Sequence, residues 1–273
     1  MTPDDPTLCW RVERACAAAW PAARRDEIAG WAVSRSGGGT RRINSASPAG
    51  ADTRLDVAGL AAIEFAYAEV AQPAILRLTD LTDDAVPLLD AAGYAPAEGS
   101  VRTLYRATGD ERTGDAAACE ERAGEARAGE GTVILDDRPG AGWLAGRRHL
   151  SVACGAGMHH HTSPAMRVSA PACFARIEAA GAACSAGFVV LHDGIAVIEG
   201  VATAPDRRRR GHAAALVSAL LQWAVESGAH GVALQVEMSN AAARRLYRRL
   251  GFTIDLYGYH YRRKVLEDSS SQQ

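Results

Sequence analysis

Apolar side chains in the second half of the chain recur with two periods, which predict strands and helices in alternation. Short apolar runs bounded by Gly, Asp and Pro predict strands, and apolar positions three or four residues apart predict amphipathic helices. The predicted strands cover 173–179, 183–191, 195–203, 232–238 and 252–261, and the predicted helices cover 212–227 and 240–250. This order of elements predicts an α/β fold in which helices flank a mixed sheet.

The first half of the chain repeats this plan in a weaker form. Its predicted strands cover 31–35, 40–45, 74–79 and 101–106, and its predicted helices cover 57–70 and 83–92. The glycines at 37–39 predict a hairpin between the first two strands. A glycine followed by an aromatic residue ends the second helix of each half, at Gly93 and at Gly251. We interpret the halves as an ancient duplication with a degenerate N-terminal copy.

Residues 107–130 have almost no large apolar side chains. Such a segment cannot bury enough apolar surface to offset the entropy of ordering it, so it predicts a flexible linker. The chain then divides into an N-terminal domain at 1–106, the linker at 107–130 and a C-terminal domain at 131–267. The polar residues 268–273 are expected to form a disordered tail.

The composition narrows the possible functions. The 273 residues include 30 basic and 32 acidic side chains, which leave a net charge of −2. This balance gives no electrostatic reason to bind nucleic acid or an anionic membrane, so neither partner is expected. No apolar run is long enough for a membrane-spanning helix, and no basic, apolar leader begins the chain. The six cysteines form no CxxC pair and no zinc-ligand spacing, which favours a cytoplasmic protein without a metal site.

One segment, Arg208-Arg209-Arg210-Gly211-His212-Ala213, lies between a predicted strand and a predicted helix. The N-terminus of a helix presents unpaired N–H groups and the positive end of the helix dipole. Gly211 would allow a tight turn, and Ala213 is small enough for a ligand to approach closely. On its own, the segment fits either a phosphate cradle or a solvated basic turn.

The pattern Arg208-x-x-Gly211-x-Ala213 resembles the acetyl-CoA pyrophosphate loop of the GNAT superfamily of N-acetyltransferases. The resemblance covers 173–263 and keeps the family's order of further landmarks, which are Asn240, Tyr247, Leu250, Gly251 and Phe252. The N-terminal half resembles the leading domain of bacterial two-domain members. The resemblance implies tandem GNAT-like mixed sheets flanked by helices, with 131–267 as the catalytic domain and acetyl-CoA as co-substrate.

The resemblance also implies roles for individual residues. The backbone of 201–203 would pair with the pantetheine arm and polarise the thioester carbonyl, and the N–H groups of 209–214 would cradle the pyrophosphate. Tyr247 is implied as the general acid for the leaving thiolate, although a buried packing tyrosine is the alternative. The implied cofactor-binding residues are Val201, Ala202, Thr203, Arg208, Arg209, Arg210, Gly211, His212, Ala213, Ala214, Asn240 and Tyr247. Since all lie beyond Gly131, a fragment that starts there is expected to retain affinity for acetyl-CoA.

Direct transfer requires an opening for the thioester and a group that takes a proton from the amine. A splay between the strands at 195–203 and 232–238 would provide the opening. Glu199 lies two residues before Val201 and therefore on the same strand face. It would act either as general base through water or only as a binding group for a cationic acceptor. Glu237, on the neighbouring strand, is the second candidate for the base.

Several other polar residues have open interpretations. The N-terminal half lacks the cradle and has Leu89 where the C-terminal half has Tyr247, so it is not expected to bind acetyl-CoA. Arg41, Arg42 and Asn44 either face the acceptor or form an inter-domain polar network. The histidines at 159–161 would point to alternating sides of an extended segment, which favours a loop over a metal site. The aromatic residues of the last strand either pack or line the acceptor pocket: Tyr257, Tyr259, His260 and Tyr261.

The sequence predicts the reaction class but not the acceptor. The favoured interpretation is direct acetyl transfer to the primary amine of a small molecule or a peptide. The rival interpretation is a non-catalytic acyl-CoA-binding or scaffold protein. The oligomeric state is left open.

Overall fold

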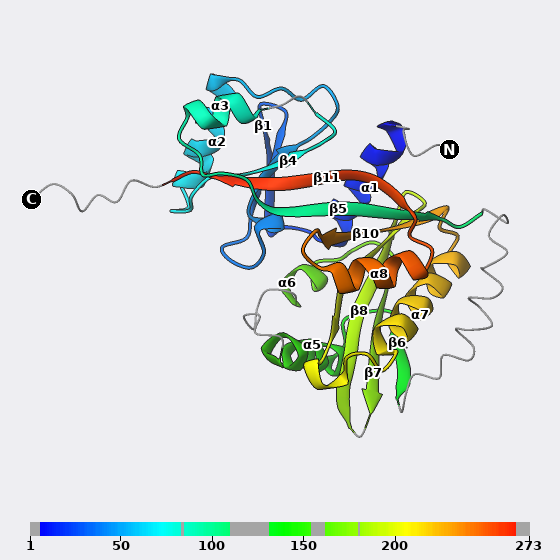
Figure 1. The fold of residues 1–273 in the computed structure, drawn as a ribbon. Coiled ribbons are helices and arrows are strands. Elements are labelled where there is room, and N and C mark those ends of the chain that lie inside the picture. The colour runs from blue at the N-terminus through cyan, green and yellow to red at the C-terminus, as the bar shows by residue number, and fades with distance from the viewer. Residues whose placement is uncertain (1–5, 83–84, 110–130, 154–161, 180, 266–273) are drawn as a thin grey trace, which may run out of the picture. The chain divides into compact units, whose positions relative to one another are not determined.

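The computed structural model describes residues 6–82, 85–109, 131–153, 162–179 and 181–265, and Figure 1 labels its elements. The chain forms two compact units. Unit 1 consists of Met1–Pro21, Thr103–Val236 and Asn240–Leu256, and unit 2 consists of Ala22–Arg102, Glu237–Ser239 and Tyr257–Gln273. Nearly all of the predicted linker, and the predicted tail, lie outside the described residues.

Unit 1 contains a sheet with the strand order β10-β9-β8-β7-β6. Neighbouring strands are antiparallel except β9 and β10, which are parallel. A parallel pair needs a crossover, and helix α7 (His212–Glu226) provides it. The strands are β6 (Thr132–Asp136), β7 (Ala172–Ala179), β8 (Ala182–His192), β9 (Ile195–Thr203) and β10 (Gly231–Glu237). The mixed sheet predicted for the C-terminal half is therefore confirmed.

Helices cover both faces of this sheet. On one face, α7 and α8 (Ala241–Arg249) bury a core that includes Ile198 and Val189 of the strands. Phe188 precedes Val189 and so points to the other face, where it contacts Trp20 after helix α1 (Pro6–Ala19) and Trp143 of α5 (Ala141–Ala153). The short helix α6 (Thr162–Ala165) follows α5 in the chain. The sheet of unit 1 is thus the middle layer of three.

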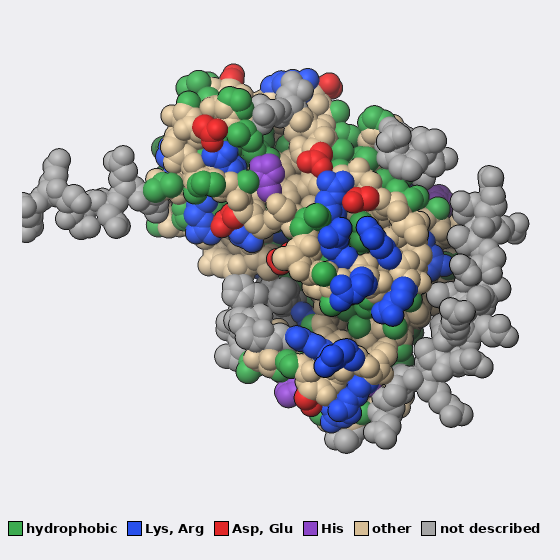
Figure 2. Space-filling model, in the orientation of Figure 1, with side chains coloured by type: hydrophobic (Ala, Val, Ile, Leu, Met, Phe, Trp, Pro, Cys, Tyr) green, Lys and Arg blue, Asp and Glu red, His purple; other side chains and the backbone are tan. Residues whose placement is uncertain are grey.

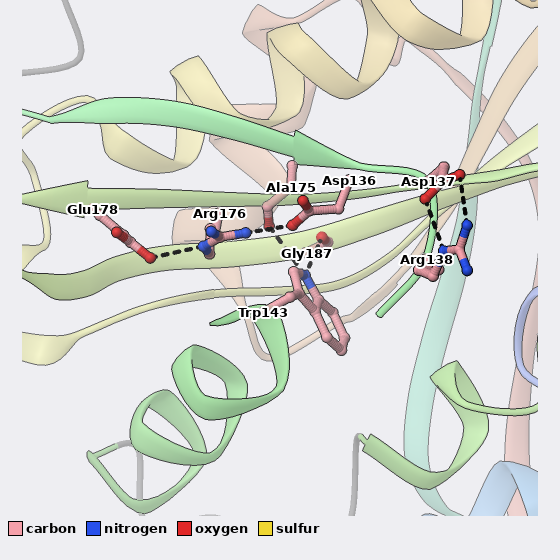
Figure 3. Close-up of polar contacts among 8 residues, drawn as sticks. All are labelled: Asp136, Asp137, Arg138, Trp143, Ala175, Arg176, Glu178 and Gly187. Carbon is pink, nitrogen blue, oxygen red and sulfur yellow. Dashed lines mark hydrogen bonds and ion pairs between the residues drawn. The ribbon is translucent and has the colours of Figure 1, made fainter. Parts of the chain in front are cut away.

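The contacts between α5 and the sheet are specific (Figure 3). The indole Nε1 of Trp143 donates to two backbone carbonyls, at 3.2 Å to Ala175 of β7 and at 3.1 Å to Gly187 of β8. Next to the edge of the sheet, Arg176 of β7 forms ion pairs with Asp136 of the edge strand β6 and with Glu178. The hydrogen bonds of Trp143 fix α5 over the sheet, and the ion pair between Arg176 and Asp136 joins β7 to the edge strand β6.

Unit 2 repeats the plan of unit 1 with shorter elements. Its sheet has the order β1-β2-β3-β4-β11, and β3 and β4 are parallel as β9 and β10 are. Tyr67, Leu76 and Leu89 lie in its buried core. Its elements are β1 (Arg24–Ile28), β2 (Trp31–Arg35), η1 (Arg41–Ile43), β3 (Ala46–Pro48), α2 (Val57–Ala68), β4 (Ile75–Thr79) and α3 (Val86–Ala91). This order agrees with the predicted degenerate copy.

The last strand of each half is shared between the units. Residues 103–107 of β5 (Glu98–Ala107) belong to unit 1, and residues 257–263 of β11 (Ile254–Arg263) belong to unit 2. Helix α1 also belongs to unit 1. The compact units therefore interleave along the chain, whereas the domains predicted at 1–106 and 131–267 are consecutive.

The second strand of one predicted hairpin is misplaced. Residues 41–43 form a 3₁₀ turn, and the expected strand at 40–45 is absent from this described segment. The side chain of Asn44 closes the loop, because its Nδ2 donates to Gly38 O at 2.8 Å and its Oδ1 accepts from Ser36 N at 2.8 Å. β2 pairs antiparallel with β3 at 46–48, just after the expected position, and it also forms a tight hairpin with β1, through a turn in which Ala29 and Gly30 both have positive φ.

Candidate functional site

Strands β9 and β10 diverge in unit 1, as the sequence predicts. Their parallel ladder runs from the pair Ile195–Gly231 to the pair Ile198–Leu234. Both strands continue, but no pair joins them beyond Ile198 and Leu234 within the described residues. The opposite edge of β9 stays paired with β8 as far as Thr203. The β10-facing edge of residues 201–203 therefore lies beyond the end of the ladder, where an extended ligand could pair with it.

A β-bulge shapes β9 at the point of divergence. Ala186 pairs with Ala202 and Phe188 with Glu199, so one residue of β8 faces two residues of β9. The first of the two is Gly200, with φ +61°. A bulge with a left-handed glycine turns the following peptide out of the regular ladder. The bulge interrupts the two-residue period, so the expectation that Glu199 and Val201 share a strand face is wrong. Val201 packs with Ile198 in the core under α7 and α8, whereas Glu199 pairs with Phe188, whose ring points to the α5 face.

The loop that follows β9 has the geometry of an anion site. Arg209 and Gly211 both have positive φ, at +60° and +84°. Gly211 is the N-cap of α7, and no side-chain cap accepts from the first turn of this described helix. Arg208 Nε approaches Thr203 O at 3.4 Å, which links the loop back to the end of β9. The N–H groups of the first turn of α7 are thus presented to a ligand.

Space is available at this helix start. An ideal Cβ built on Gly211 meets no heavy atom within 4 Å among the described residues. His212, the first residue of α7, is buried, and its Nδ1 has no hydrogen-bond partner within the described structure. Burial, followed by the charges of Arg207 and Arg210, lowers the pKa of His212, which favours a neutral imidazole. The chain contributes a neutral side chain and backbone donors here, which fits a phosphate ligand.

Exposed arginines lie on the predicted cradle and on α8. The exposed arginines of unit 1 in this region are Arg208, Arg209 and Arg210 of the loop and Arg245, Arg248 and Arg249 of α8. Figure 2 shows basic side chains gathered on the surface that carries α8. The local charge is therefore positive although the whole chain is nearly neutral, and a polyanionic ligand is favoured at this surface.

Tyr247 lies on the inner face of α8. Asn240 caps this helix, since its Oδ1 accepts from Ala243 N at 3.0 Å, as the sequence predicts. Tyr247 is 8% exposed and contacts the ring of Phe252 edge-on, with centroids 6.0 Å apart. Burial, with a smaller effect of the Glu199 carboxylate, raises the pKa of Tyr247 to about 12. The phenol therefore remains protonated throughout the neutral pH range.

The two predicted carboxylates differ in their surroundings. Glu199 is 6% exposed and lies one residue beyond the last β9–β10 pair. Its carboxylate is the smaller of the two causes of the raised pKa of Tyr247. Glu237 is exposed at the end of β10 and belongs to unit 2, where Ser239 Oγ approaches its Oε2 at 3.5 Å. Of the two carboxylates, Glu199 is therefore the one that is buried where β9 leaves β10.

The remaining candidates lie elsewhere or outside the described residues. Arg41 of unit 2 pairs with Glu98 and lies 4.8 Å from the ring centroid of Tyr261. Arg77 lies over Tyr259 in the same way. Arg41, Tyr259 and Tyr261 therefore have interaction partners within unit 2. The histidines at 159–161 are not among the described residues.

Two residues beside the bulge, Trp143 and Arg147, were not predicted from the sequence. Trp143 and Arg147 of α5 are both buried, and Arg147 Nη1 donates to Gly200 O at 2.5 Å. No motif singles them out. The only signal in the sequence is an arginine on the apolar face of a helix, four residues after a tryptophan.

Comparisons with known proteins agree with this geometry. The model of the family described as "Probable histone acetyltransferase Rv0428c C-terminal" matches residues 9–264. The aminoglycoside N(6')-acetyltransferase type 1 of Serratia marcescens is 36% identical over 58 residues, which are 21% of this chain and 40% of that protein. The alignment thus spans two fifths of the length of this relative.

Solved structures share the fold at low sequence identity. A GCN5-related N-acetyltransferase from Kribbella flavida has a TM-score of 0.67 and 17% identity, with 97% of this chain and 99% of that chain covered. A tandem GNAT protein from the clavulanic acid biosynthesis pathway has a TM-score of 0.53 and 11% identity, with 82% and 76% covered. Two GNAT-like halves in one chain therefore occur in a solved relative of this fold.

Proposed function

The chain belongs to the family described as "Probable histone acetyltransferase Rv0428c C-terminal" and has the fold of GNAT acetyltransferases; from this premise we propose that it transfers an acetyl group from acetyl-CoA to a primary amine. The observation that carries the proposal is the divergence of β9 and β10 beyond Ile198 and Leu234, next to the uncapped start of α7. A strand edge and a helix N-terminus together suit a ligand with an amide-containing arm and a pyrophosphate.

The binding residues divide by the part of acetyl-CoA that they would hold. The N–H groups of 209–214 would bind the pyrophosphate, and the arginines of the loop would supplement its charge neutralisation. The backbone of Val201, Ala202 and Thr203 would pair with the pantetheine arm. Bound acetyl-CoA supplies a thioester that an amine can attack. Asn240 serves this site indirectly, because its side chain caps the helix that carries Tyr247.

The catalytic residues would act on protons and developing charge. The Val201 N–H would stabilise negative charge on the carbonyl oxygen. Glu199, a buried carboxylate, would attract the cationic amine and take its proton directly or through water. In these roles, Glu199 lies on one side of the reacting carbon and Tyr247 on the other. This requires both side chains to line the site where β9 leaves β10.

The raised pKa of Tyr247 refines its role. A thiol has an ordinary pKa of about 8.5, so complete proton transfer from a phenol with a pKa of about 12 would be uphill by roughly 5 kcal/mol. Donation of a hydrogen bond to the departing thiolate has no such cost. We therefore assign Tyr247 as the donor that stabilises the thiolate, with the amine's own proton available to neutralise it.

The charge of Glu199 is our reason for proposing a cationic acceptor. Glu199 places a negative side chain at the site, which favours an amine that is cationic before it reacts. The names of the relatives point to two kinds of acceptor, an aminoglycoside amino group and a histone. Thiol release from acetyl-CoA, measured against aminoglycosides, histone-tail peptides and amino acids, tests the proposal. Thiol release with at least one amine supports it, whereas binding of acetyl-CoA without release by any amine supports the scaffold rival.

Gly211→Glu is expected to weaken acetyl-CoA binding by more than about tenfold, because it adds a bulky anion beside the phosphates. Gly211→Ala is the matched control. It introduces the same strain at φ +84° but only a methyl group, so it should retain more of the affinity. Calorimetric titration of both variants measures the difference. Equal affinities for wild type and Gly211→Glu would remove the cradle from the start of α7.

A further inference from the structure

The bulge in β9 is held from one side by α5. Trp143 and Arg147 lie four residues apart on this helix and therefore on one face. Trp143 Nε1 donates to Gly187 O at 3.1 Å, and Arg147 Nη1 donates to Gly200 O at 2.5 Å. Gly187 is the β8 residue opposite the bulge, and Gly200 is the first residue of the bulge. One helix face thus supplies a donor to a carbonyl on each strand of the irregular pair.

The close approach of α5 makes these bonds possible. An ideal Cβ on Gly146 would lie 2.9 Å from Ala183 Cβ, and one on Gly142 would lie 3.1 Å from Arg176 Nη2. Two glycines on the face that meets the sheet therefore bring the helix nearer than side chains would allow. The Arg147 guanidinium lies 6.0 Å from the Trp143 ring centroid, so the two donors are themselves adjacent.

The bonded carbonyl fixes the direction of the next N–H. Gly200 C=O and Val201 N–H belong to one planar trans peptide, so they point in opposite directions. When Arg147 holds the carbonyl toward α5, the Val201 N–H must point away from α5. At a bulge the regular ladder does not set this direction, and a left-handed glycine would otherwise let the peptide rotate.

We propose that Arg147, supported by Trp143, is a positioning residue that aims the Val201 N–H at the reacting carbonyl. The inference rests on the proposed function, in which this N–H stabilises the oxyanion. Both side chains are buried, so neither is required to touch the acceptor. α5 would thereby act on catalysis through the backbone of β9 and not through contact with substrate.

Arg147→Met tests the proposal in the full chain. It removes the donor while keeping a side chain of similar length, and it should lower kcat by about tenfold through misalignment of one donor. The dissociation constant for acetyl-CoA should stay within about twofold, because the cradle is untouched. Arg147→Lys retains a cationic donor and should recover most of the activity. Trp143→Phe keeps an aromatic side chain, smaller than the indole, but removes Nε1, and a smaller fall in kcat is expected.

Arg148→Met is the matched control, since Arg148 is the next residue of α5 and is exposed. Its kcat should equal that of wild type. An unchanged kcat for Arg147→Met, or an equal loss for Arg148→Met, would overturn the proposal. If the wild type itself releases no thiol, the proposed function has failed, and the Val201 amide resonance then decides the positioning role. Arg147→Met must shift that resonance, and Arg148→Met must not; an unshifted Val201 amide in Arg147→Met overturns the inference.

Discussion

A chain that lacks residues 1–21 is expected not to fold. Helix α1 buries Leu8, Cys9 and Val12 against unit 1, and Trp20 stacks on Phe188 at a centroid distance of 5.9 Å. Burial of each large apolar side chain contributes about 1.5–3 kcal/mol. Four such side chains match a large part of the roughly 5–15 kcal/mol that stabilises a typical domain. Circular dichroism and thermal melting of the truncated chain would show the loss of structure.

For a fragment that starts near Gly131, the structure favours the opposite of the retained acetyl-CoA affinity that the sequence leads one to expect. Such a fragment lacks α1 and also residues 103–107, which place the buried Leu104 and Tyr105 in unit 1. We now expect it to be unfolded and to bind no acetyl-CoA. A well-folded fragment with wild-type affinity would show that α1 and β5 are dispensable.

A point substitution in α1 tests the packing of this helix without shortening the chain. Val12 is fully buried and Arg14 is exposed on the same helix. Val12→Asp should destabilise the protein by about 3 kcal/mol or more, because it buries a carboxylate in an apolar layer. Arg14→Asp should change the melting temperature little. Equal effects of the two substitutions would contradict the assignment of α1 to the core of unit 1.

Tyr247→Phe is expected to lower turnover by about 10²-fold or more, a typical size for the loss of one donor to developing negative charge. The substitution keeps the ring that packs on Phe252. Acetyl-CoA affinity and melting temperature should therefore stay close to wild type, so that the loss falls on kcat. Steady-state thiol release with an identified amine, alongside calorimetry, measures both quantities.

Tyr105→Phe is the matched control for this result. Tyr105 is a buried tyrosine of unit 1 whose ring lies against Gly231. Gly231 is at the paired start of β10, away from the end where β9 and β10 diverge. Turnover should not change in this variant. Unchanged turnover in Tyr247→Phe would mean that water or another group serves the thiolate.

The sequence predicts the elements from β7 to β11 because local signals mark each boundary. Asp193 and Gly194 form a tight turn with positive φ at both positions, Gly211 starts α7 and Asn240 caps α8. Each signal has a backbone cause that depends on one or two residues. Gly211 and Asn240 also mark the loop and the helix of the candidate site, whereas the roles of the loop residues and of Tyr247 come from the resemblance to GNAT acetyltransferases.

Other features depend on partners far along the chain. Residues 103–107 of β5 join unit 1 and residues 257–263 of β11 join unit 2, and no local pattern indicates which sheet a strand will enter. The expected strand at 40–45 has Ile43 as its single apolar residue, and Asn44 bonds to the backbone of its own loop and competes with a ladder. Arg147 acquires its role only from the Gly200 carbonyl, 53 positions away.

Amide hydrogen exchange of the full chain, with and without acetyl-CoA, would show where the cofactor binds. We expect acetyl-CoA to bind against the β10-facing edge of β9 and the first turn of α7. This binding mode predicts slower exchange at residues 201–203 and 211–214 when acetyl-CoA is present, with no change in α2, the corresponding helix of unit 2. Absence of protection at both segments, or protection confined to α2 and its preceding loop, would contradict the account.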